Sequence, residues 1–97
     1  MKLYLVHCGY YDSEICEGLY EGHANFFVAA ESAQDACLKV KLISEFKAKH
    51  MHVDGLQELV SVDGYEVELK WGKSSQKGKS IVINHRQREL APKKNNL

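Results

Sequence analysis

The sequence predicts an α+β fold, in which one helix packs on a mostly antiparallel sheet of four to five strands in the order ββαβββ. Only residues 32–49 place apolar side chains at helical spacing. The other apolar segments are short, and several alternate with polar residues as half-buried strands do. Asp63-Gly64 lies between two apolar runs and predicts a tight hairpin with positive φ at Gly64, because glycine adopts that conformation without steric cost.

The composition is that of one ordinary globular domain. The chain has 97 residues, of which 44% are hydrophobic and 27% are charged. No apolar run approaches the roughly 18–20 residues that a membrane span needs, so we expect no insertion into a membrane. The N-terminal segment, residues 1–8, is too short and too mixed in polarity for a secretory signal. Three cysteines, an odd number, then fit reduced thiols in a cytoplasmic protein.

The net charge of zero conceals a segregation of charge along the chain. Residues 1–69 carry 5 Lys/Arg against 12 Asp/Glu, a net charge of −7, and residues 70–97 carry 8 against 1, a net charge of +7. The basic end could attract a polyanion, lie across the acidic body or remain a solvated tail. We expect the domain to span residues 1–84 and a basic polar tail to span 85–97, with residues 92–97 disordered.

The first half of the chain predicts two strands and a long connection. Leu3–Cys8 predicts the first strand, which ends at a glycine. Residues 10–22 are rich in tyrosine, acids and glycine and predict a long loop or a loose hairpin connection. Asn25–Ala30 is apolar on both faces, which is typical of a strand at the centre of its sheet.

The helix begins after Ser32, which is placed to cap it, with Asp35 at capping-box spacing. Its apolar positions form two adjacent stripes: Leu38, Leu42 and Phe46 in one, and Ala36, Val40 and Ile43 in the other. We expect both stripes to face the sheet and Phe46 to be buried.

Three further strands are expected after the helix. Met51–Val62 predicts a strand with an irregularity at Asp54-Gly55. Tyr65–Trp71 alternates strictly and predicts a strand with one buried face. Ser80–Asn84 predicts a short fifth strand. If the second and third strands are parallel, the crossover through the helix should be right-handed.

Several short pieces of the chain through residue 70 resemble a known family. They are Lys2–Val6 leading into Gly9-Tyr10, Glu21-Gly22-His23 before the strand Phe26–Ala29, the helix start Ala33–Ala36, and His52-Val53-Asp54 followed nine residues later by Asp63-Gly64-Tyr65. In this order they resemble a mostly bacterial family known as domain of unknown function 1543. Its members often carry the unit twice, whereas this chain has room for one. No activity is established for the family, so the resemblance implies a fold and no reaction.

The candidate ligand-binding residues are His23, His52 and Asp54. A neutral imidazole held by a carboxylate can act as a base or as a metal ligand. The structural alternative is that His52 or Asp54 hydrogen-bonds the backbone at the bend before Gly55. No close-spaced ligand motif is present, so the sequence predicts neither a metal site nor a cofactor.

Two tyrosines and one cysteine complete the candidates. Tyr10 and Tyr11, in the expected loop, could line a ligand pocket or an interface. Cys8 could be a nucleophile with His7 or His23 as its base, although inert packing is the more usual role of such a cysteine. The chain contains no phosphate-binding glycine loop, nucleophile elbow or dinucleotide fingerprint, which argues against an enzyme without excluding one.

Three functions follow, the first being a non-enzymatic interaction module that forms a homodimer. One helix covers one face of a sheet, so either Phe26 and Val28 or Phe27 and Ala29 must lie on the other face. A second copy could cover that face by two-fold symmetry. The first alternative is a small-molecule or metal binder, or an enzyme, that uses the His and Asp candidates. The second is polyanion binding by the basic end, although few aromatics accompany it and nucleic acid is not favoured.

Overall fold

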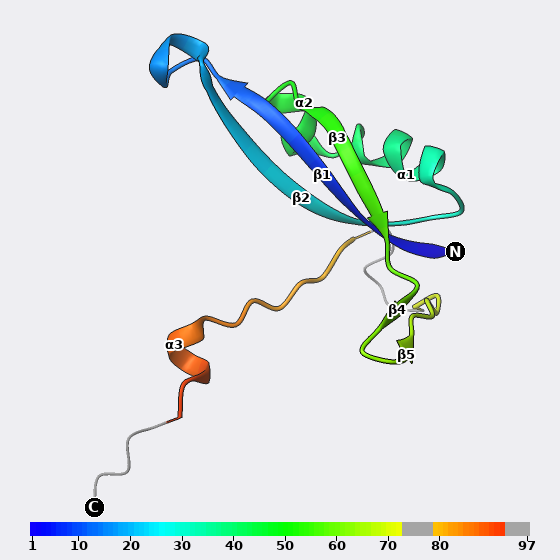
Figure 1. Ribbon diagram of the computed structural model, residues 1–97. Coiled ribbons are helices and arrows are strands. Elements are labelled where there is room, and N and C mark those ends of the chain that lie inside the picture. Colours follow the sequence, from blue (N-terminus) through cyan, green and yellow to red (C-terminus); the bar gives the residue numbers. More distant parts are fainter. Residues whose placement is uncertain (73–78, 93–97) are drawn as a thin grey trace, which may run out of the picture.

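A three-stranded antiparallel sheet with helices on one face forms the body of the protein (Figure 1). The structure, a computed structural model, describes residues 1–72 and 79–92. Strands β1 (Lys2–Asp12) and β2 (Tyr20–Ala30) form a long hairpin, and β3 (His52–Glu58) pairs with the other edge of β1. The strand order is β2-β1-β3, and both pairings are antiparallel. The predicted α+β class and mostly antiparallel sheet are therefore confirmed.

The centre of the sheet is β1, whereas the sequence indicated β2. The prediction rested on the apolar character of Asn25–Ala30 on both faces. One of these faces is buried, since Val28 and Ala30 are 8% and 0% exposed, but Phe27 on the other face is 55% exposed. Apolar residues on both faces therefore do not identify the central strand, because centrality is set by backbone pairing on both edges, and β1 has two partner strands.

The long loop or loose hairpin connection expected over residues 10–22 is a hairpin connection that is shorter than predicted. The ladder between β1 and β2 continues to the pair Asp12 and Tyr20, so the connection is only residues 13–19, including the 3₁₀ turn η1 (Cys16–Gly18). Gly22 pairs with Tyr10, and a Cβ at Gly22 would overlap the tyrosine ring. A glycine at this position therefore lets the tyrosine lie flat across the neighbouring strand.

The single predicted helix is two helices, α1 (Ala33–Val40) and α2 (Ser44–Ala48). The predicted cap is present, since the Ser32 hydroxyl accepts a hydrogen bond from the Asp35 amide at 3.1 Å. Between the helices Ile43 is extended, with φ −69° and ψ 133°. The chain therefore breaks its helical phase before α2 begins.

This break decides which apolar residues face the sheet. Val40 and Phe46 are buried as predicted, at 0% and 8% exposure. Leu38 and Leu42 were predicted to be buried with Phe46, but they are 64% and 70% exposed. The stripe that joins these three residues exists only on one continuous helix, and the extended residue between α1 and α2 turns Phe46 to a new direction.

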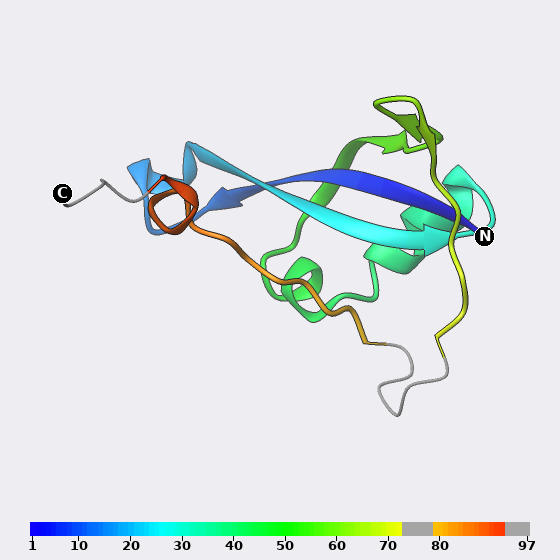
Figure 2. The same ribbon diagram turned by 90° about the horizontal axis from the view of Figure 1, so that it is seen from below.

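The core lies between the helices and one face of the sheet, which we call the covered face. Figure 2 shows α1 and α2 together on that side. Among the described residues, the buried hydrophobic residues that form this core are Tyr4, Val6, Cys8, Val28, Ala30, Ala36, Val40, Phe46 and Met51. The opposite face, which we call the open face, carries the alternate residues of each strand, and α3 (Gln87–Leu90) lies away from it (Figure 1).

A separate hairpin follows the sheet, formed by β4 (Ser61–Val62) and β5 (Tyr65–Glu66). Gly64 has φ 84° and Asp63 has φ 51°, so the predicted turn residues form the expected tight turn. The strand predicted over Tyr65–Trp71 ends at Glu66, and the Val67 amide still donates a backbone hydrogen bond to Val60 O at 3.0 Å.

The C-terminal part of the chain differs further from the prediction. Ser80–Asn84 forms no strand, because apolar β-branched side chains do not suffice without a partner strand for the backbone. The prediction for the last residues, 93–97, lies outside the described residues. Within the described ranges, no helix has the length and apolar character needed to cross a membrane.

Candidate functional site

The open face is apolar at one end and polar at the other. Along β1, the residues of this face alternate with the buried ones, and they pair with residues of β2 that also face away from the helices. At the apolar end, Leu5 pairs with Phe27. At the polar end, His7 pairs with Asn25 and Gly9 pairs with His23. Titratable side chains thus gather over the far half of the sheet.

A β-bulge in β3 adds Asp54 to this face. His7 pairs with Gly55 and Cys8 pairs with Val53, which leaves Asp54 as the extra residue between them. A bulge redirects a side chain that the regular alternation would send to the opposite face. The sequence predicted an irregularity at Asp54-Gly55, and the bulge confirms it.

The bulge lets Asp54 reach imidazoles from two strands. His52 Nε2 lies 3.0 Å from Asp54 Oδ1, and His23 Nδ1 lies 3.6 Å from Asp54 Oδ2. Glu21 Oε1 lies 3.8 Å from His23 Nε2 and 3.9 Å from His52 Nε2. The three candidates His23, His52 and Asp54 therefore converge, far within the roughly 10 Å beyond which direct cooperation would be excluded.

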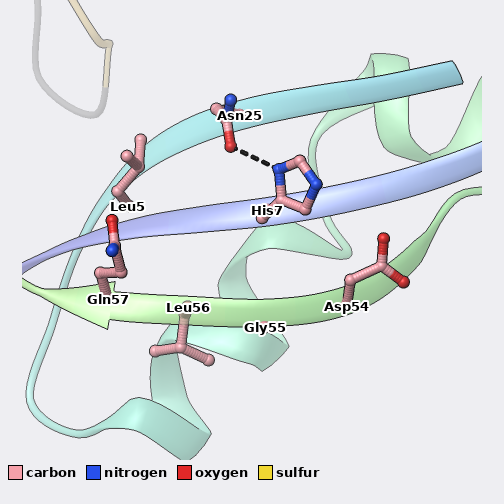
Figure 3. Close-up of a pocket in the computed structure, with 7 residues that line it drawn as sticks. All are labelled: Leu5, His7, Asn25, Asp54, Gly55, Leu56 and Gln57. Atoms are coloured by element: carbon pink, nitrogen blue, oxygen red, sulfur yellow. Dashed lines mark hydrogen bonds between the residues drawn. The ribbon is translucent and has the colours of Figure 1, made fainter.

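His7 joins the same group from the central strand. Its ring stacks on the ring of His23, with centroids 4.9 Å apart and planes 12° apart. His7 Nδ1 is hydrogen-bonded to Asn25 Oδ1 at 2.8 Å (Figure 3). With the amide oxygen as acceptor, the imidazole donates from Nδ1 and keeps the Nε2 lone pair free.

We call His7, Glu21, His23, His52 and Asp54 the imidazole–carboxylate cluster. The sequence suggested His7 only as a base for Cys8 and did not suggest Glu21 as a site residue. The usable signal was the pairing of the first two strands: once Tyr10 is placed opposite Gly22, His7 and His23 become diagonal neighbours on one face.

Gly9 provides the space beneath the cluster. A Cβ at this position would lie 2.7 Å from His52 Nε2 and 2.9 Å from Asp54 Oδ2, closer than atoms can pack. Any larger residue at position 9 would therefore displace both side chains. Gly55, on the same face, has no atom within 4 Å of such a Cβ, so its surroundings are open.

Only one of the two candidate tyrosines lies beside the cluster. The ring of Tyr11 lies on the open face, with its centroid 6.2 Å from that of His52. Tyr10 points to the covered face, where the Lys49 ammonium lies 4.8 Å from its ring centroid. His50 terminates the helical segment with φ 48° and belongs to neither ligand group of the cluster.

Cys8 is separated from the histidines by the sheet itself. It is fully buried on the covered face, whereas its neighbour His7 lies on the open face. Burial raises the pKa of the Cys8 thiol, and the Asp54 carboxylate and Cys37 raise it further. A buried thiol on the face opposite to His7 and His23 is a packing group, so this geometry argues against the nucleophile hypothesis.

A cavity adjoins the cluster along β3. Its volume is about 520 Å³, and it is lined by Leu5, His7, Asn25, Asp54, Gly55, Leu56 and Gln57 (Figure 3). In this view His7 and Asp54 stand on neighbouring strands on the same side of the sheet. Cluster atoms are therefore accessible to a ligand from solvent.

The cluster contains two overlapping groups that could hold a metal ion. One is His7, His23 and Asp54, and the other is Glu21, His52 and Asp54. Within each group the ligand atoms lie within 4.8 Å of one another. Imidazole and carboxylate are donors that suit zinc and neighbouring transition metals.

Comparison with known proteins identifies the family. The model of the family Domain of Unknown Function (DUF1543) matches residues 18–69, which is more than half of the chain. The chain belongs to this family. The match includes His23, His52 and Asp54, whereas β1 with His7 and Gly9 precedes it. No curated protein and no solved structure matches the chain.

Proposed function

We propose that this DUF1543 protein binds a divalent transition-metal ion at the imidazole–carboxylate cluster, as a binding protein rather than an enzyme. The observation that carries the proposal is the convergence of three imidazoles and two carboxylates from three strands. With bonds of 2.0–2.2 Å, the ligands of a tetrahedral ion lie about 3.3–3.6 Å apart. The separations of 3.0 and 3.6 Å around Asp54 lie within about 0.3 Å of that range.

The competing interpretation is a network of surface ion pairs. Partly exposed ion pairs contribute about 0–1 kcal/mol, so stability alone gives little reason to assemble one. Two local features nevertheless serve this arrangement: the bulge that presents Asp54, and Gly9, which leaves room for it. Gly9 lies on the central strand β1 and the bulge lies on the edge strand β3, so two neighbouring strands both contribute to the arrangement.

Calorimetric titration of the chelator-treated protein with Zn²⁺ tests this function. Asp54→Asn and His23→Ala should each weaken binding by about tenfold or more, because each removes a ligand. His85→Ala is the matched control, since it removes an exposed imidazole outside both metal-ligand groups and should leave the affinity unchanged. Equal affinity in wild type and Asp54→Asn would contradict the proposal.

A second candidate function, self-association as a homodimer, is favoured by the apolar end of the open face. Phe27 is 55% exposed there and pairs with Leu5. Trp71, Lys79 and Ser80 line a cavity beside Phe27 but leave about half of its side chain exposed. A second copy that places the same surface against it would bury both residues in a two-fold interface. Phe27 lies at the end of the face away from the cluster, whereas Leu5 also lines the cavity beside the cluster, so a dimer that buries Leu5 would cover part of that cavity.

Light scattering at low micromolar concentration tests the dimer. The wild type should have twice the chain mass of 11.0 kDa, and Phe27→Ser should have the mass of one chain. Leu42→Ser is the control, because Leu42 is 70% exposed on the helical layer and should not affect the interface. A wild-type mass of one chain under these conditions excludes this candidate.

A further inference from the structure

The two metal-ligand groups of the cluster share one residue, Asp54, and this has a consequence for the number of ions bound. Its two carboxylate oxygens face different imidazoles: Oδ1 faces His52 at 3.0 Å, and Oδ2 faces His23 at 3.6 Å. If Asp54 held a single ion together with both histidines, one of its oxygens, or both as a chelating pair, would point to one position between the two imidazoles. Here the oxygens diverge toward separate partners.

We infer that the cluster is a two-ion centre in which Asp54 bridges two divalent transition-metal ions, an inference that rests on the proposed metal binding. The first ion takes His7, His23 and Asp54 Oδ2, and the second takes Glu21, His52 and Asp54 Oδ1. Two ions bridged in this way lie about 3.5–4 Å apart in known two-metal sites.

Each half of the centre has a complete minimal ligand set. Three protein ligands leave one coordination position open on a tetrahedral ion, and the exposed face of the sheet leaves that position to solvent. In the first half, the hydrogen bond to Asn25 Oδ1 occupies His7 Nδ1, so that Nε2 is the ligand atom. In the second half, Glu21 Oε1 lies 3.9 Å from His52 Nε2.

The charge of the surrounding body is suited to two cations. Two carboxylates in the cluster offset only half of the charge of two divalent ions. Residues 1–69 carry a net charge of −7, so the remaining positive charge lies in an acidic body. None of the five Lys/Arg in this range takes part in an ion pair with Glu21 or Asp54 among the described residues.

The number of ions bound per chain is the direct test, measured by equilibrium dialysis of the chelator-treated protein against Zn²⁺ with metal analysis. Wild type should bind two ions per chain. His7→Ala removes a ligand from the first half only, and Glu21→Gln from the second half only, so each should retain one ion. Asp54→Asn should lower the affinity for both ions by about 10–100-fold, because it removes the shared ligand.

A spectroscopic measurement on the wild type does not depend on how the variants fold. Two Co²⁺ or two Cu²⁺ ions joined by one carboxylate are magnetically coupled, so electron paramagnetic resonance at full loading should show a spin-coupled pair. At half loading, an uncoupled signal should appear. His85→Ala, outside the cluster, should behave as wild type in both experiments.

The outcomes separate the two proposals. Binding of one ion per chain, weakened equally by His7→Ala and Glu21→Gln, with an uncoupled signal at saturation, overturns the two-ion centre and leaves the proposed function intact. Absence of any Zn²⁺ binding by wild type overturns both. Two ions that survive Asp54→Asn with unchanged affinity overturn the bridging role of this residue.

Discussion

The two faces of the eleven-residue strand β1 have different roles. On the covered face Tyr4, Val6 and Cys8 are 2%, 0% and 0% exposed, and they form the core with the helices. On the open face His7 and Gly9 contribute to a polar cluster that stays in contact with solvent. The covered face supplies most of the stability, and the open face can therefore hold charged groups without their full desolvation.

The largest expected effect is on the covered face, at Phe46. Phe46→Ala should lower the free energy of unfolding by about 3–5 kcal/mol, the usual cost of removing a core aromatic. Leu42→Ala, four residues earlier, should change it by no more than about 0.5 kcal/mol, because that side chain is exposed. Urea denaturation measures both, and similar losses in the two variants would mean that the helical layer is misplaced.

The next effect compares the thiols of Cys8 and Cys16. Iodoacetamide should modify the exposed Cys16 at least about a hundredfold faster than Cys8, whose reaction requires opening of the covered face. Mass spectrometry of peptides from the native protein gives the two rates. Comparable rates would show that the covered face is not closed.

The raised pKa of Cys8 adds a pH dependence with a defined sign. Because folding raises this pKa through burial, the unfolded chain loses the thiol proton first as the pH increases. The contribution of Cys8 to stability is therefore fully present below the ordinary thiol pKa and declines above it. Cys8→Ala should remove this part of the alkaline loss.

The smallest of these effects should arise on the open face, at Gly9. Gly9→Ala places a Cβ 2.7 Å from His52 Nε2 and should lower Zn²⁺ affinity by about tenfold, near 1.4 kcal/mol. Gly55→Ala is the matched control, since its Cβ would meet no atom within 4 Å, and it should leave the affinity unchanged. Equal affinities for wild type and Gly9→Ala would mean that His52 and Asp54 are not held as ligands here.

Much of the local structure was accessible from sequence. Ser32 caps the first helix, Gly64 has positive φ in a tight turn, and the irregularity at Asp54-Gly55 is a bulge. Each depends on interactions within a few residues, which propensity and spacing describe well. The α+β class followed from the same patterns.

The candidate site was accessible only in part. His23, His52 and Asp54 were identified from their chemistry, but His7 and Glu21 were not, since their roles depend on the ladder between β1 and β2. The extension of that ladder beyond Gly9 was not predicted, because the composition of residues 10–22 is typical of a loop. A residue of a strand acquires its neighbours from the register, and register is a property of two segments together.

Sequence by itself determined the class of the fold, the turn, the cap and the residues able to bind a ligand, because these depend on side-chain chemistry and short-range backbone preference. Tertiary structure alone decided that β1 is central, that the helix breaks and exposes Leu42, and that side chains from three strands meet over Gly9. The physical reason is that strand order and register are selected by burying the best apolar face of the whole chain, a competition among distant segments that no local pattern encodes.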